Sequence, residues 1–99
     1  MLRQAIRGLV LLASFGGAVS AAAADAPPGA SSCSGCHAPS AAVQTPVPRL
    51  VGRPAAEIVT AMQAFRTGQR QATVMDRIAK GFSESEIASI AAWYAAQND

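Results

Sequence analysis

The segment Cys33-Ser34-Gly35-Cys36-His37 constrains this 99-residue chain more than any other part of it. It has the form Cys-x-x-Cys-His, which is the attachment pattern of a c-type haem. Each thiol can add to one vinyl group of the haem, and the imidazole of the next residue can reach the iron. On a helix the two cysteines and the histidine share one face. The motif therefore predicts one covalently attached haem c, held by Cys33 and Cys36, with His37 as an iron ligand.

Two other kinds of site use cysteines at this spacing. A thioredoxin-like redox pair accompanies a βαβ pattern, and this sequence has no strand pattern. A zinc site needs about four protein ligands, whereas the chain contains two cysteines and one histidine. We therefore favour haem attachment. Because His37 is the only histidine, a haem with two histidine ligands cannot form within one chain.

Residues 1–24 have the features of a cleaved secretory signal peptide. Arg3 and Arg7 are followed by an uncharged stretch over 8–24 that ends in three alanines, a typical cleavage site. The alternative is an uncleaved anchor, but the stretch is rich in Gly, Ala and Ser and falls short of the ~20 apolar residues of a spanning helix. We expect cleavage before Asp25, a single domain over 25–99, a periplasmic location and no stable membrane insertion afterwards.

Cleavage would leave an electrically neutral domain. The sequence has eight basic and six acidic residues, and loss of Arg3 and Arg7 leaves six of each. No basic stripe remains, so the composition argues against binding to nucleic acid. A domain of about 75 residues has a marginal core. A covalently held haem would add a large apolar surface for side chains to pack on.

The region after residue 25 predicts helices only. A short helix that begins at residue 30 or 31 should carry the motif, and a Pro- and Gly-containing loop over 38–53 should wrap one side of the haem. Pro54 should take the first position of a second helix that ends at Gly68. Its apolar stripe is Ile58, Ala61, Met62 and Phe65.

Two more helices are predicted beyond a polar loop over 67–73. The third should cover about 75–80 and end at Gly81. The fourth should start with a capping box between Ser83 and Glu86, with Phe82 packed on Ile87. We expect Trp93 and Tyr94 to pack this helix on the first, and an electron-relay role for Trp93 is the less favoured alternative. The apolar stripe is Ile87, Ile90, Ala91 and Tyr94, bordered by Trp93.

The sixth iron ligand must come from another segment. Met62 lies on an apolar stripe, where methionine usually fills the core. Met75 follows a polar loop at the start of a short helix, so we predict Met75, with Lys80 as a remote alternative. A His/Met pair raises the reduction potential, and a six-coordinate iron favours outer-sphere electron transfer over catalysis. A vacant sixth position would instead indicate a binder of gas or peroxide.

From Cys33 to Gln97 the chain resembles the class I cytochromes c. After the haem motif, the resemblance rests on Pro-Arg-Leu-Val-Gly at 48–52 and on two longer segments. The segment over 65–82 and the one over 83–94 are most similar to the haem subunit of flavocytochrome c sulfide dehydrogenase. Soluble bacterial two-domain cytochromes carry similar halves, but this chain has a single haem motif.

This resemblance implies a small all-α class I cytochrome c fold with three to four helices around one haem. It implies that Cys33 and Cys36 hold the haem, that His37 and Met75 are the axial ligands, and that the Pro48 carbonyl accepts a hydrogen bond from His37 Nδ1. The family usually has Gly after the histidine, where this chain has Ala38. If that turn needs a positive φ, the start of the loop must differ.

The resemblance also implies an electron carrier without catalytic activity of its own. Its partner would be an FAD-containing flavoprotein that oxidises sulfide, and the haem subunit would pass the electrons to other redox carriers. The alternative is a free mono-haem cytochrome that carries electrons in a respiratory or photosynthetic chain. Residue composition and spacing do not indicate sulfide chemistry.

Overall fold

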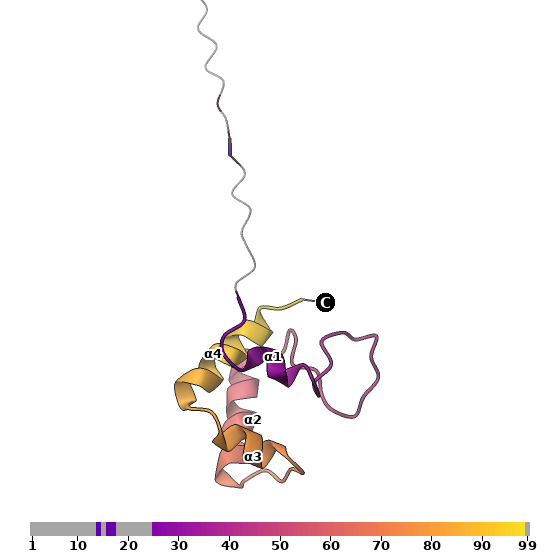
Figure 1. Cartoon of the computed structure of the whole chain (residues 1–99), viewed down its shortest axis with the longest axis vertical. Helices are drawn as coiled ribbons and strands as arrows, with labels where there is room; N and C mark the ends of the chain where they lie inside the picture. Colours follow the sequence, from indigo (N-terminus) through magenta and orange to yellow (C-terminus); the bar gives the residue numbers. More distant parts are fainter. Residues whose placement is uncertain (1–13, 15, 18–24, 99) are drawn as a thin grey trace, which may run out of the picture.

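The computed structural model describes residues 14, 16–17 and 25–98. The predicted signal segment therefore lies outside the described residues, apart from Ser14, Gly16 and Gly17. The described residues form helices and no strands, as the sequence predicts, and the fold is all-α (Figure 1). The helices are α1 (Ala30–Cys33), α2 (Ala55–Thr67), α3 (Met75–Lys80) and α4 (Glu84–Ala95).

The start of α1 depends on Gly29. This residue has a φ of 86°, a left-handed conformation that a side chain disfavours. A Cβ at Gly29 would also lie 2.6 Å from Cε1 of Phe82, which follows α3. The absence of a side chain thus lets Phe82 approach the backbone just before the haem motif. Phe82 itself packs against the core.

Helix α2 begins one residue later than predicted and includes Thr67, which was assigned to the following loop. Pro54 is the cap with a ψ of 133°, so it precedes the helix and does not occupy its first position. Gly68 ends the helix as expected, with a φ of 77° and a hydrogen bond from its N–H to the Phe65 carbonyl oxygen. Helix α3 has the predicted bounds and ends at Gly81.

The predicted capping box at the start of α4 is confirmed. Ser83 Oγ accepts a hydrogen bond of 3.2 Å from the Glu86 N–H, and Glu86 Oε1 accepts one of 3.0 Å from the Ser83 N–H. The hydrogen bond from the Ser83 N–H to the carboxylate and, to a smaller extent, the Ser83 side chain lower the pKa of Glu86. The buried face of α4 is the one that its periodicity predicts: Ile87, Ile90, Ala91 and Tyr94.

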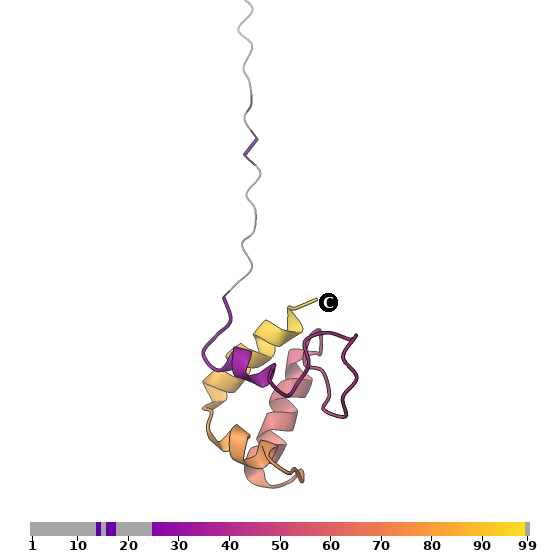
Figure 2. The same cartoon turned by 45° about the vertical axis from the view of Figure 1, so that its right-hand side comes forward.

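The core lies where α1, α2 and α4 meet. Helix α2 packs against α3 and α4, and α1 packs against α4. In both views α3 lies below α1, and the segment between α1 and α2 extends to the right of the helices (Figures 1 and 2). The central cluster of the core consists of Ala30, Ile58, Ile90, Ala91 and Tyr94.

No described helix combines the length and apolar character needed to cross a bilayer.

Candidate functional site

The haem motif begins on α1 and continues as a tight turn. The Cys36 and His37 N–H groups both donate to the Cys33 carbonyl oxygen, at 3.2 and 2.8 Å. The helical path thus extends past the last residue of α1 and keeps the three motif side chains close together. Both cysteines are free thiols. Cys33 is half-buried and Cys36 is exposed.

The imidazole of His37 is held by the loop after it. Its Nδ1 lies 2.5 Å from the Pro48 carbonyl oxygen. A carbonyl oxygen can only accept, so Nδ1 carries the proton and the other ring nitrogen, Nε2, is left as the potential metal ligand. The structure therefore brings together His37 and Pro48 in the manner that the family resemblance implies.

The loop that supplies Pro48 is fixed at both ends. Near its start, the Arg49 guanidinium donates a 3.3 Å hydrogen bond to the Pro39 carbonyl oxygen. Near its end, the Gly52 N–H donates to the Tyr94 carbonyl oxygen on α4 at 3.0 Å. Ala38 is 8% exposed and, like every described residue other than glycine, has a negative φ. The turn after His37 therefore accommodates alanine without backbone strain.

The environment of Cys33 involves a residue from the far end of the chain. The hydroxyl of Tyr94 donates to the Ala30 carbonyl oxygen and lies 2.9 Å from Ser34 Oγ. Because the single phenolic proton is used on Ala30, Ser34 is the donor in the second bond. Burial raises the pKa of the Cys33 thiol, against the smaller effect of hydrogen bonds that include one with Tyr94.

Sequence analysis predicted that Tyr94 packs on the first helix but not these hydrogen bonds. A buried tyrosine hydroxyl needs a polar partner, and this requirement alone could have indicated that Tyr94 forms a hydrogen bond. The partner could not be chosen from the sequence, because many carbonyl and hydroxyl groups satisfy it. Ser34, a variable position of the haem motif, is thus a residue that sequence reasoning missed.

The two candidate methionines occupy different environments. Met62 lies on α2 and packs against the core. Met75 is the first residue of α3, half-buried and outside the core cluster. Among the described helices α3 packs on α2 and not on α1, so Met75 and Cys33 belong to helices that do not contact each other. Met75 would therefore reach a bound haem from a different part of the fold than the motif does.

The residues present fit a covalently attached haem. The motif supplies two free thiols and an oriented imidazole, and Met75 supplies a thioether. Three large apolar side chains are also strongly exposed. Val74 is 48% exposed and precedes Met75, Ile78 is 38% exposed one helical turn later, and Val43 on the loop after His37 is 53% exposed. Contact with an apolar macrocycle would cover side chains of this kind.

Known proteins place the chain in a family. No protein-family model matches it. Over 69 residues it is 36% identical to cytochrome c-554(548) of Halomonas halodenitrificans, a match that covers 66% of this chain and 83% of that relative. Over 63 residues it is 38% identical to the cytochrome subunit of sulfide dehydrogenase of Chlorobaculum tepidum. This match covers 64% of this chain and 57% of that relative.

The chain therefore belongs to the class I c-type cytochromes, the electron-transfer proteins that the fold and the motif indicate. Within this class it is similar to the cytochrome subunit of sulfide dehydrogenase, as the sequence segments at 65–94 suggest. The match spans little more than half the length of that subunit.

Proposed function

We propose that this chain is a periplasmic mono-haem cytochrome that accepts electrons from a flavoprotein sulfide dehydrogenase and passes them to a downstream carrier. A haem bound there would supply a reversible one-electron iron couple. Cys33 and Cys36 would hold it by thioether bonds, and His37 and Met75 would bind the iron. The observation that carries the haem assignment is the hydrogen bond from His37 Nδ1 to Pro48, beside two free thiols.

The protein residues act here by orientation and by exclusion of other ligands. The hydrogen bond to Pro48 fixes the tautomer of the His37 ring and leaves Nε2 as the nitrogen that would bind the metal. The uncharged Met75 sulfur would favour the ferrous state and raise the reduction potential. With His37 and Met75 both bound to the iron, no position would remain for a substrate, which suits an electron carrier and not a haem enzyme.

The partner proposal rests on the likeness to the cytochrome subunit of sulfide dehydrogenase. A second candidate, a free mono-haem carrier, is favoured by a different observation. The relative named cytochrome c-554(548) is covered over 83% of its length, against 57% for the sulfide dehydrogenase subunit. The two candidates share the same chemistry at the iron and differ in whether the chain is bound to a flavoprotein.

Two measurements test these proposals separately. The denatured mass of protein isolated from its native cells should equal residues 25–99 plus one haem, which tests cleavage, export and covalent attachment. A mass without haem would refute the cytochrome site. Native purification should then recover the chain together with an FAD-containing subunit. A haem-bearing monomer whose elution is unchanged by the flavoprotein would support the free carrier instead.

A further inference from the structure

Asp76 is a carboxylate with one oxygen that is shielded from solvent and has no hydrogen-bond partner. It lies half-buried in the first turn of α3, next to Met75. In the described part of the chain, its Oδ1 atom is buried and receives no hydrogen bond. A shielded oxygen of this kind costs free energy, so its position calls for an explanation. The other described acidic residues are all exposed: Asp25, Glu57, Glu84 and Glu86.

The two sides of α3 differ in what covers them. Ala79 follows Asp76 by three residues, so the two side chains share one side of the helix. Ala79 is completely buried, whereas Ile78, two residues after Asp76 and therefore on the other side, is exposed. Met75 lies between these sides, three residues before Ile78 and four before Ala79. Asp76 is thus on the side that protein covers, and Met75 borders the side that a bound haem would cover.

The cations nearest to Asp76 in sequence are screened more strongly than its buried oxygen. Arg77 and Lys80 are the basic residues of α3, and both are exposed. Water and salt weaken the field of exposed charges, whereas a shielded charge is screened much less. The negative charge of Asp76 therefore acts on its surroundings with less compensation than the positions of these cations in the sequence suggest.

We propose that Asp76 lowers the reduction potential of the haem iron and so opposes the effect of its neighbour Met75. This inference rests on the proposed binding of Met75 to the iron. Because adjacent Cα atoms are about 3.8 Å apart, the Asp76 carboxylate would lie at roughly 10 Å from an iron that Met75 binds. The ferric site carries one more positive charge than the ferrous site, so a nearby anion favours the ferric state.

The role of Asp76 in the redox step is electrostatic only. On oxidation, one electron leaves the iron for the downstream carrier, and no bond forms or breaks at Asp76. The uncharged Met75 sulfur would favour the ferrous state, whereas the Asp76 carboxylate would favour the ferric state. Two consecutive residues at the start of α3 would thus set the potential by opposite effects.

Asp76→Asn tests this role because it removes the charge and keeps the shape of the side chain. At roughly 10 Å and an effective dielectric constant of about 25–50, one unit charge changes an equilibrium constant about three- to tenfold. The reduction potential should therefore rise by about 30–60 mV, since a tenfold change in a one-electron equilibrium corresponds to about 59 mV. Voltammetry of the holoprotein at pH 7 measures the shift. Asp76→Glu retains the charge and should keep the wild-type potential.

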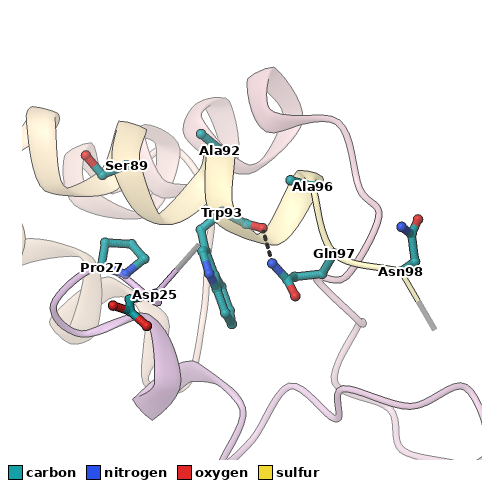
Figure 3. A pocket seen from close by; sticks show the side chains of 8 residues that line it. All are labelled: Asp25, Pro27, Ser89, Ala92, Trp93, Ala96, Gln97 and Asn98. Carbon is teal, nitrogen blue, oxygen red and sulfur yellow. Dashed lines mark hydrogen bonds between the residues drawn. The ribbon is translucent and has the colours of Figure 1, made fainter. Parts of the chain in front are cut away.

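Two exposed carboxylates provide matched controls. Asp25→Asn makes the same chemical change in a residue that lines an open pocket beside the C-terminal half of α4 (Figure 3). None of the described residues that line this pocket belongs to α3. Glu84→Gln removes an acid from the first turn of α4, as Asp76→Asn does in α3, so it reproduces any loss of helix-dipole stabilisation. Both controls should shift the potential less, and only the Asp76→Asn shift should persist at high salt.

Carbon monoxide separates the charge of Asp76 from a role in holding Met75 at the iron. Reduced Asp76→Asn should not bind carbon monoxide at neutral pH, because Met75 would still occupy the sixth position. Asp76→Ala, a second neutral variant, should raise the potential and likewise exclude carbon monoxide. The proposal is overturned if the potential rises only in variants that bind carbon monoxide, or if Asp76→Asn shifts it no more than the controls do.

The failure of this inference is distinguishable from the failure of the proposed function. A wild-type mass without haem would end the proposed function itself. Equal potentials in wild type, Asp76→Asn and Asp76→Ala, measured on protein of full holo mass, would refute the role of Asp76 alone.

Discussion

The Tyr94 hydroxyl donates a hydrogen bond to the Ala30 carbonyl oxygen across a separation of 64 residues. The same hydroxyl accepts from Ser34, and the Tyr94 carbonyl oxygen accepts from the Gly52 N–H. One residue of α4 thus contacts α1, the turn of the haem motif and the loop that holds His37. Since Tyr94 is 1% exposed, its bond to Ala30 is buried, and the last helix organises the segment proposed to carry the haem.

Tyr94→Phe should destabilise the holoprotein by about 1–3 kcal/mol. The ring packing is kept, but the buried Ala30 carbonyl oxygen and the Ser34 hydroxyl lose their partner. Equilibrium unfolding in guanidinium chloride measures the change. Ser32→Ala removes an exposed hydroxyl of α1, the helix that carries Ala30, and should stay within about 0.5 kcal/mol of wild type. Equal losses in the two variants would show that the Tyr94 hydrogen bonds contribute nothing special.

Stability should fall at high pH because of the same residue. Burial raises the pKa of Tyr94 above its ordinary value of 10.0. The folded state therefore holds the phenolic proton more tightly than the unfolded state does. This contribution is complete below pH 10 and is lost as the pH rises through the folded-state pKa. The free energy of unfolding should decline more steeply above pH 10 in wild-type protein than in Tyr94→Phe, and parallel curves would contradict the assignment.

Local signals in the sequence predicted most of the helices. Gly68 and Gly81 mark the ends of α2 and α3, and the Ser83–Glu86 capping box marks the start of α4. These signals depend on backbone groups within a few residues, so they can be recognised without tertiary structure. The exact start of α2 could not be predicted from such signals, because proline is compatible both with the cap position and with the first position of a helix.

Of the proposed site, the sequence pattern alone indicated only the attachment motif. The spacing of Cys33, Cys36 and His37 identifies the motif directly, and the His37–Pro48 bond followed from family resemblance and not from spacing. The contacts of Tyr94 with Ser34 and of Gly29 with Phe82 join segments that are far apart in sequence. Such pairs depend on how the helices pack, and no local pattern specifies them.

Gly29→Ala should be more destabilising than Gly68→Ala. Both glycines have positive φ values, 86° and 77°, so alanine adds about 1–2 kcal/mol of backbone strain at either position. At Gly29 the new methyl would also lie 2.6 Å from Phe82, whereas at Gly68 no atom lies within 4 Å. Overpacking adds about 1–3 kcal/mol. Denaturant unfolding of the two holoproteins gives the difference.

A smaller side chain at position 82 serves as the control for this comparison. Phe82→Leu introduced together with Gly29→Ala should recover part of the lost stability, because it removes the ring that the methyl meets. If Gly29→Ala and Gly68→Ala lose the same amount, or if Phe82→Leu only adds to the loss, then contact with Phe82 is not the reason for glycine at position 29.

Ala38→Gly should destabilise the protein although it restores the residue usual in the family. Ala38 is buried and has a negative φ, so glycine gains no conformation that it needs. It loses a buried methyl group and adds about 0.4–1 kcal/mol of conformational entropy to the unfolded chain. Ala41→Gly, in an exposed part of the same loop, should show the entropic loss alone. A stability gain at position 38 would mean that the turn is strained by alanine.

Met75→Ala should lower the reduction potential and allow the reduced protein to bind carbon monoxide at neutral pH. The uncharged sulfur favours ferrous iron, and its removal also opens the sixth position. Met62→Ala is the matched control: it truncates a side chain packed on the core and should cost about 2 kcal/mol or more of stability, with potential and ligand binding unchanged. Voltammetry and carbon monoxide difference spectra measure both. If only Met62→Ala binds carbon monoxide, the axial ligand is Met62; if neither variant does, Lys80 is the remaining candidate.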